Sequence, residues 1–330
     1  MSNLYFVSGQ ISALESQLLT RGQLDRMIGA PSPDEAFSVM SELSYAQYFD
    51  ESLKAKDFAK VIETGLGETK KLLVDGTDNH SVLGFVWWRF DLNNIKRALK
   101  EKFLEGATSI GDFNEDNGYA RLGTLDADEI QAAVFEGAEV SDLRPEFAAV
   151  LTKYLNKDSL ESIQDLEIEL DTAYFTILKK VGKGPVKSYV KYLIDDYNLR
   201  VVARNTLIFE REMQEEQWMS GGTLSFHVFK GVDTQSFRST LKQTPFAAEF
   251  THVKESISSE ELLFLVEQGV DRYVYSWLGN ESLGSDSILR VLYYFEQRLQ
   301  NARVLKTIML SKFYGLTHEA IEEKLKHIGH

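Results

Sequence analysis

Apolar residues recur at intervals of three and four along most of the chain, which is the spacing of one face of an α-helix. Three segments carry this pattern over more than twenty residues, at about 81–105, 186–211 and 286–314. Few prolines and many good helix formers accompany the pattern. We therefore predict an all-α protein.

Shorter helices are predicted from the same spacing and from residues that start or stop helices. They cover residues 5–30, 34–45, 52–73, 126–136, 142–155, 159–180, 233–242, 259–278 and 317–327. Ser32 is a candidate N-cap, with Pro33 at the first helical position. The stretch 107–124 is rich in Gly, Asp and Asn and is predicted to be a loop.

Each long segment has an asparagine near its middle, at Asn94, Asn198 and Asn301. The three asparagines lie 104 and then 103 residues apart, and apolar residues agree at several positions before and after them. A spacing that holds over the whole chain indicates internal repetition. We predict three helical repeats, over residues 1–110, 111–220 and 221–330. The alternative is chance agreement between amphipathic helices.

The apolar faces before and after each asparagine point in different directions. Each long helix is therefore buried on all sides, or it breaks near the asparagine, whose side chain readily bonds local backbone. Asp91 and Asp195 lie three residues before Asn94 and Asn198, whereas the third copy has Arg298. The pattern favours a helix-breaking or capping role for the two aspartates over a general-acid role.

A basic residue follows each asparagine by two positions, as Lys96, Arg200 and Arg303. In a three-fold arrangement these side chains would form a ring of positive charge that binds an acidic partner. The alternative is that all three are ordinary solvated helix residues.

The composition narrows the classes of function. The chain has 330 residues, a formal net charge of −14 and 43% hydrophobic residues, which indicates a globular protein. The absence of cysteine excludes disulfides, thiolate nucleophiles and cysteine-ligated zinc. The negative charge disfavours binding to nucleic acid or directly to anionic lipid. No apolar run reaches the roughly 18 residues of a membrane span, and the first ten residues lack a secretory signal pattern.

No motif predicts a catalytic, cofactor-binding or metal site. The run 182–188 contains two lysines, but its spacing and its missing preceding strand do not fit a phosphate loop. The run 112–123 imitates a calcium loop, yet Asn117 stands where Gly is required and Gly123 where Glu is required. The six histidines show no metal-binding spacing.

The order of short motifs along the chain resembles the C/d (AC39-like) family of V-type ATPase and V/A-type ATP synthase subunits, which has archaeal, bacterial and eukaryotic members. The resemblance rests on residues 7–19, 27–30, the helix to Ser44-Tyr45, and residues 89–95, 195–200, 221–224, 244–246 and 303–316. No single run is specific, but their order covers nearly the whole chain. The departures are the acidic stretch 112–126 and a weak middle copy of the short helix.

The resemblance implies three similar helical units around a pseudo-three-fold axis, shaped as a funnel. It implies a non-catalytic rotor protein without cofactors, peripheral on the cytoplasmic face of the membrane and monomeric when isolated. The protein would be a socket between D/F-type central shaft subunits and the membrane proteolipid ring, transmitting torque for ion transport. The alternatives are a helical-repeat scaffold of an unrelated complex and an enzyme whose site is assembled from distant residues.

Overall fold

The computed structural model gives helices as the regular elements of the chain. It describes residues 4–43, 46–49, 52–77, 80–114, 118–155, 162–254, 256–283 and 288–327. Every regular element within these ranges is helical, so the all-α prediction is confirmed. None of the helices in these ranges is both long enough and apolar enough to cross a membrane.

The chain divides into two compact units. The first contains residues 1–78 and 268–330, and the second contains residues 79–267. The division into thirds, the pseudo-three-fold axis and the funnel shape remain predictions.

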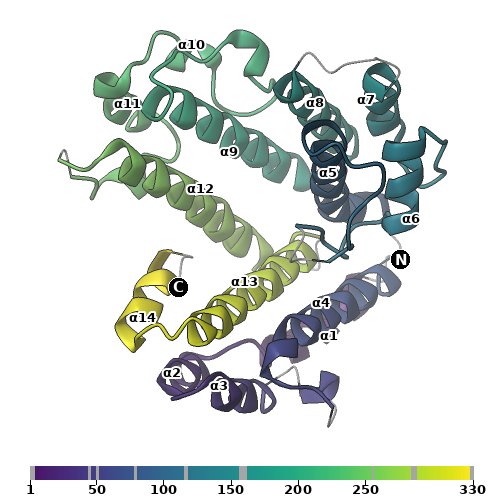
Figure 1. Cartoon of the computed structure of the whole chain (residues 1–330). Coiled ribbons are helices and arrows are strands. Elements are labelled where there is room, and N and C mark those ends of the chain that lie inside the picture. The colour runs from purple at the N-terminus through teal and green to yellow at the C-terminus, as the bar shows by residue number, and fades with distance from the viewer. Residues whose placement is uncertain are drawn as a thin grey trace. The chain divides into compact units, whose positions relative to one another are not determined.

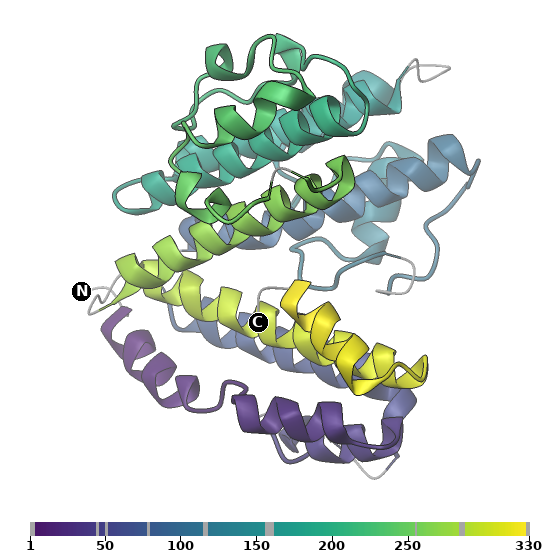
Figure 2. The same ribbon diagram turned by 90° about the vertical axis from the view of Figure 1, so that its left-hand side faces the viewer.

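The first unit joins the N-terminal helices to the last helices of the chain (Figure 1). Its elements are α1 (Leu4–Glu15), α2 (Arg21–Gly29), α3 (Pro33–Met40), η1 (Ala46–Tyr48), η2 (Ala55–Asp57), α4 (Phe58–Asp75), α13 (Ile288–Phe313) and α14 (His318–His327). The helix α12 (Ser259–Ser282) begins in the second unit and ends in the first. Within the first unit α13 packs against α1, α3, α4 and α14, and Figure 2 shows α14 lying along the end of α13.

The prediction of one helix over residues 5–30 is wrong, because α1 ends at Glu15 and α2 begins at Arg21. Thr20 caps α2: its hydroxyl accepts from the Gln23 N–H at 3.4 Å, and Gln23 Oε1 accepts from the Thr20 N–H at 2.9 Å. Such a reciprocal pair satisfies free backbone donors and fixes a new helix start.

The cap predicted for α3 is confirmed, with Ser32 Oγ accepting from the Glu35 N–H at 3.2 Å and Pro33 in the first turn. The helix ends at Met40, earlier than the predicted end. Ser44 and Tyr45, which belong to that prediction, lie outside the described residues.

The second unit is built on α5 (His80–Leu104), α8 (Ile163–Val181) and α9 (Val186–Leu207). Its other elements are α6 (Ala127–Ile130), the π-helical turn η4 (Gln131–Glu136), α7 (Pro145–Leu155), η5 (Glu215–Gln217), α10 (Phe226–Phe229), α11 (Thr234–Leu241) and η6 (Ala247–Phe250). The helix α8 packs against α5, α7 and α9, and α5 and α8 lie side by side in Figure 1. The single turn α10 was not predicted, since four residues show no periodicity.

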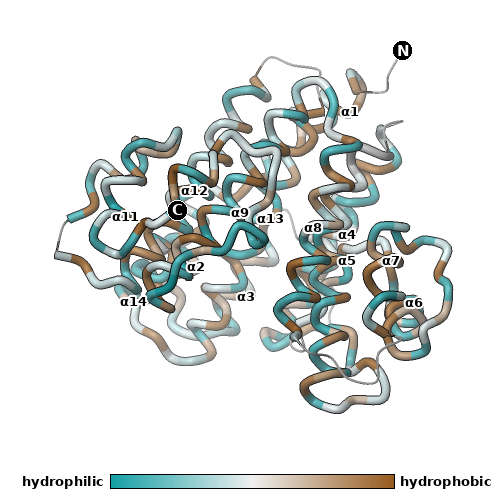
Figure 3. The backbone as a smooth tube through the Cα atoms, turned by 90° about the horizontal axis from the view of Figure 1, so that it is seen from above, coloured by the Kyte–Doolittle hydropathy of each residue, from teal (hydrophilic) through white to brown (hydrophobic). Residues whose placement is uncertain are grey.

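The three long helices run without interruption through Asn94, Asn198 and Asn301. The predicted break near the asparagine is therefore wrong. In α9 the buried residues include Tyr189, Ile194 and Leu199 as well as Asn198, while the side of its middle that carries Asp196 and Arg200 is partly exposed. Figure 3 shows how apolar and polar residues alternate along the helices.

Candidate functional site

Asp195 on α9 holds a loop that lies 28 residues further along the chain. Its carboxylate accepts from the Thr223 N–H at 2.9 Å, from the Thr223 hydroxyl at 2.5 Å and from the Leu224 N–H at 3.0 Å. The Asp195 side chain is fully buried. Burial raises the pKa of Asp195, and the hydrogen bonds from Thr223 and Leu224 oppose that rise.

Asp91 on α5 holds a second loop in the same way. It accepts from the Thr124 N–H at 2.7 Å, from the Thr124 hydroxyl at 2.6 Å and from the Leu125 N–H at 3.0 Å. The sequence Gly-Thr-Leu at 123–125 recurs at 222–224, so the two loops match in sequence as well as in contacts.

The asparagine one helical turn further along holds the same loop at a second point. Asn94 donates to the Ala120 carbonyl and accepts from the Ala120 N–H, both at 2.9 Å. Asn198 donates to the Met219 carbonyl and accepts from the Met219 N–H, again both at 2.9 Å. The side-chain amide thus pairs with one residue of the loop as a backbone peptide would.

We call each Asp and Asn pair, together with the loop it holds, a clasp. The first clasp joins Asp91 and Asn94 to residues 120–125, and the second joins Asp195 and Asn198 to residues 219–224. Residues three apart on a helix share a face, so one face of each long helix presents both side chains to its loop. The predicted helix-breaking or capping role of the aspartates is wrong, because both helices continue and the carboxylates bind a distant segment.

Each clasp requires a glycine beside its carboxylate. A Cβ atom on Gly123 would lie 2.2 Å from Asp91 Oδ1, and one on Gly222 would lie 2.1 Å from Asp195 Oδ1. Any side chain there would displace the loop from the aspartate. These close approaches explain why both loops have glycine directly before the threonine.

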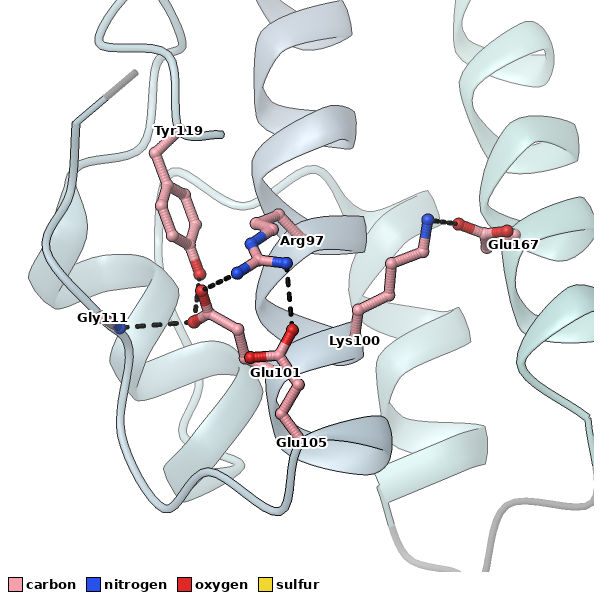
Figure 4. Close-up of polar contacts among 7 residues, drawn as sticks. All are labelled: Arg97, Lys100, Glu101, Glu105, Gly111, Tyr119 and Glu167. Atoms are coloured by element: carbon pink, nitrogen blue, oxygen red, sulfur yellow. Dashed lines mark hydrogen bonds and ion pairs between the residues drawn. The ribbon is translucent and has the colours of Figure 1, made fainter. Parts of the chain in front are cut away.

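The loop of the first clasp is also fixed to the end of α5 (Figure 4). Glu101 accepts from the Tyr119 hydroxyl at 2.7 Å and from the Gly111 N–H at 3.3 Å, and it pairs with Arg97 at 3.0 Å. Burial together with Glu101 raises the pKa of Tyr119 well above its ordinary value. The predicted loop over 107–124 is thus tied down along the described part of its length; residues 115–117, within the calcium-like run, lie outside it.

The third long helix departs from the clasp pattern. Arg298 replaces the aspartate, and it is buried on α13 with contacts of its own. Asn301 is buried, yet its Nδ2 has no hydrogen-bond partner among the described residues. Leaving a buried donor unsatisfied costs about 1–3 kcal/mol. The repeat asparagines Asn94, Asn198 and Asn301 therefore share a position, but within the described residues only the first two hold a loop.

The predicted basic positions have different surroundings. Lys96 pairs with Asp171 on α8 at 2.5 Å, and both side chains are mostly buried. Arg200 pairs with Asp196 at 2.6 Å and donates to the Glu267 carbonyl at 3.3 Å. Arg303 is exposed on α13 in the first unit, whereas the other two belong to the second. Lys96 and Arg200 thus already brace helices, and a partner-binding ring of all three stays a prediction.

Replacing Lys96 with Met is expected to lower the free energy of unfolding by about 1–2 kcal/mol, between the values typical of exposed and fully buried ion pairs. Burial already raises the pKa of Asp171 and Lys96 opposes that rise, so the variant leaves a buried carboxyl without its cation. Urea unfolding followed by circular dichroism measures the loss. Arg303→Met is the control and is expected to stay within about 0.5 kcal/mol of the wild type. Equal losses in both variants would contradict the bracing role.

A family model described as ATP synthase (C/AC39) subunit matches residues 7–324. No curated protein matches the chain. The match includes all three long helices and both clasps, and it confirms the family resemblance found in the sequence.

Proposed function

Because the chain belongs to the ATP synthase (C/AC39) subunit family, we propose that it is the socket of a V-type or A-type rotary ATPase. In this role it joins D/F-type central shaft subunits to the membrane proteolipid ring, from the cytoplasmic side. The family is a structural part of the ATP synthase complex and does not supply its catalytic site. The observation that carries the proposal is the family match over nearly the whole chain.

The contacts within the second unit are consistent with a protein that transmits torque. Such a part has to keep its shape under load, so its loops as well as its helices need fixed positions. The two clasps fix two long loops to α5 and α9 through hydrogen bonds to buried aspartates. The ion pairs of Lys96 with Asp171 and of Lys100 with Glu167 (2.8 Å) join α5 to α8.

Binding to the shaft tests the proposal. The full chain is mixed with purified shaft subunits from the same organism, and complexes are detected by size-exclusion chromatography with light scattering. We expect a stoichiometric complex. A parallel experiment mixes the chain with the proteolipid ring in detergent, and we expect it to elute with the ring.

A folded monomer that binds neither the shaft nor the ring would overturn the proposal. Circular dichroism establishes that the chain is folded in that experiment. The alternative would then be a scaffold for an unrelated complex, since helical repeats commonly present extended binding surfaces.

A further inference from the structure

The contact between α5 and α8 has a regular arrangement of charges. Lys96 pairs with Asp171 at 2.5 Å. Lys100 pairs with Glu167 at 2.8 Å. The two bases lie four residues apart on α5, and the two carboxylates lie four residues apart on α8 in the opposite direction. Both basic residues of α5 therefore have a carboxylate on the helix that packs against them.

The second long helix repeats this arrangement at the start of α12. Arg204 pairs with Glu267 at 2.7 Å, and Arg200 donates to the Glu267 carbonyl at 3.3 Å. Arg200 and Arg204 lie 104 residues after Lys96 and Lys100, so they occupy the same repeat positions. At both contacts an acidic residue of the neighbouring helix thus lies beside the basic residues of the long helix.

The contact between α4 and α13 in the first unit keeps the first basic residue but lacks a carboxylate for it. Arg303 occupies the repeat position of Lys96, and it is exposed without a partner among the described residues. Gly67 of α4 lies 104 residues before Asp171, which is the spacing of the first two repeats. Glycine therefore stands where α8 has the carboxylate that pairs with Lys96.

A stacked aromatic pair sets the register of α4 against α13. The rings of Phe58, at the start of α4, and Phe313, at the end of α13, lie 6.0 Å apart. The end of α4 and the first half of α13 line one pocket, so the two helices are antiparallel. Gly67 is nine residues after Phe58 and Arg303 is ten residues before Phe313, which places the two opposite each other. Nothing lies within 4 Å of the position that a Cβ on Gly67 would take, so this space is open.

Apolar side chains continue the exposed stripe of α13 that begins at Arg303. Leu310 and Tyr314 lie seven and eleven residues further along, close to two and three helical turns, so all three residues share one side of the helix. Leu310 is 38% exposed and Tyr314 is 78% exposed. Arginine and tyrosine beside exposed apolar surface are typical of protein interfaces.

We infer that the surface formed by Gly67, Arg303, Leu310 and Tyr314 is the docking site for an acidic helix of a neighbouring subunit of the rotary complex. This inference rests on the proposed function. A carboxylate of that helix binds Arg303 in the open space beside Gly67, and apolar side chains of the same helix cover Leu310 and Tyr314. Charge complementarity identifies the occupant, because the equivalent Lys96 is bound by a carboxylate of a packed helix.

The variant Gly67→Asp tests the geometry in the isolated chain. Its carboxylate would lie beside Arg303, so its urea midpoint is expected to exceed that of Gly67→Asn, which has the same shape without the charge. In an Arg303→Gln background the two midpoints are expected to agree. Equal midpoints in the wild-type background, or a difference that persists without Arg303, would overturn the inference.

Binding to partners tests the docking itself. The wild type and its variants are assayed by biolayer interferometry against the purified shaft subunits and, separately, against the purified ring in detergent. Arg303→Gln and Gly67→Asp are each expected to lose at least ten-fold in affinity toward the same one of these partners. The first removes the base, and the second supplies it with an internal carboxylate.

Matched variants make the loss of affinity specific. Gly67→Asn is expected to lose at most three-fold, and Lys324→Gln, which removes an exposed charge from α14, is expected to stay within two-fold of the wild type. Unchanged affinities of Arg303→Gln toward both partners would overturn the docking site, as would a loss in Arg303→Gln without one in Gly67→Asp. A wild-type chain that binds neither partner would instead refute the proposed function, and this inference with it.

Discussion

The variant Asp195→Ala is expected to lose about 3 kcal/mol of unfolding free energy, the largest effect predicted for any single residue of the chain. The carboxylate is fully buried and accepts from two backbone N–H groups and one hydroxyl. Alanine leaves these donors without an acceptor, and each unsatisfied buried donor costs about 1–3 kcal/mol, part of which water recovers at the half-exposed loop. Urea unfolding followed by circular dichroism measures the change.

The neighbouring residue Asp196 provides the control. It pairs with Arg200 at 2.6 Å, four residues along the same helix, and both side chains are partly exposed. Partly exposed pairs of this kind contribute about 0–1 kcal/mol, so Asp196→Ala is expected to lose less than 1 kcal/mol. Similar losses in the two variants would show that the second clasp contributes nothing beyond ordinary helix-surface charge.

The variant Gly222→Ala is expected to lose about 2–3 kcal/mol of unfolding free energy, although it adds only one methyl group. The added Cβ would lie 2.1 Å from Asp195 Oδ1, far inside contact distance, so the loop or the aspartate has to move. Overpacking a tight site typically costs about 1–3 kcal/mol, and here the hydrogen bonds from Thr223 and Leu224 weaken as well. Thermal and urea unfolding measure the loss.

The matched control is Gly67→Ala in the middle of α4. Nothing lies within 4 Å of the position that its Cβ would take. Alanine loses less backbone entropy than glycine when the chain folds into a helix. The unfolding free energy of this variant is therefore expected to rise by about 0.5–1 kcal/mol. A lower unfolding free energy in Gly222→Ala together with a higher one in Gly67→Ala would support the clasp geometry. A loss of unfolding free energy in both variants, or in neither, would contradict it.

Local periodicity was sufficient to predict the three long helices. The segments predicted at 81–105, 186–211 and 286–314 correspond to α5, α9 and α13, because the spacing of apolar residues reflects a helix face that neighbours in sequence form together. The break between α1 and α2 was missed, although Thr20 and Gln23 have the spacing of a capping box. The apolar pattern on both sides of the break masked that signal.

The role of the aspartates depended on partners far away in the sequence. Asp91 and Asp195 bind loops 33 and 28 residues further along, and loop residues carry no periodicity that would predict such pairing. One signal was present: Gly-Thr-Leu follows both aspartates, at 123–125 and 222–224, and is absent after Arg298. Comparing the repeats beyond their helices would have predicted two clasps.

The sequence by itself determined that this protein is all-helical, where its three long helices lie and that it belongs to a family of rotary ATPase subunits. These properties follow from local spacing and from the order of motifs along one chain. Only the tertiary structure decided which polar side chains already have partners within the chain. It gave Lys96 and Arg200 partners on other helices and left the Asn301 amide buried without one among the described residues. Whether a buried polar group is satisfied depends on segments brought together by packing, which spacing along a single helix does not encode.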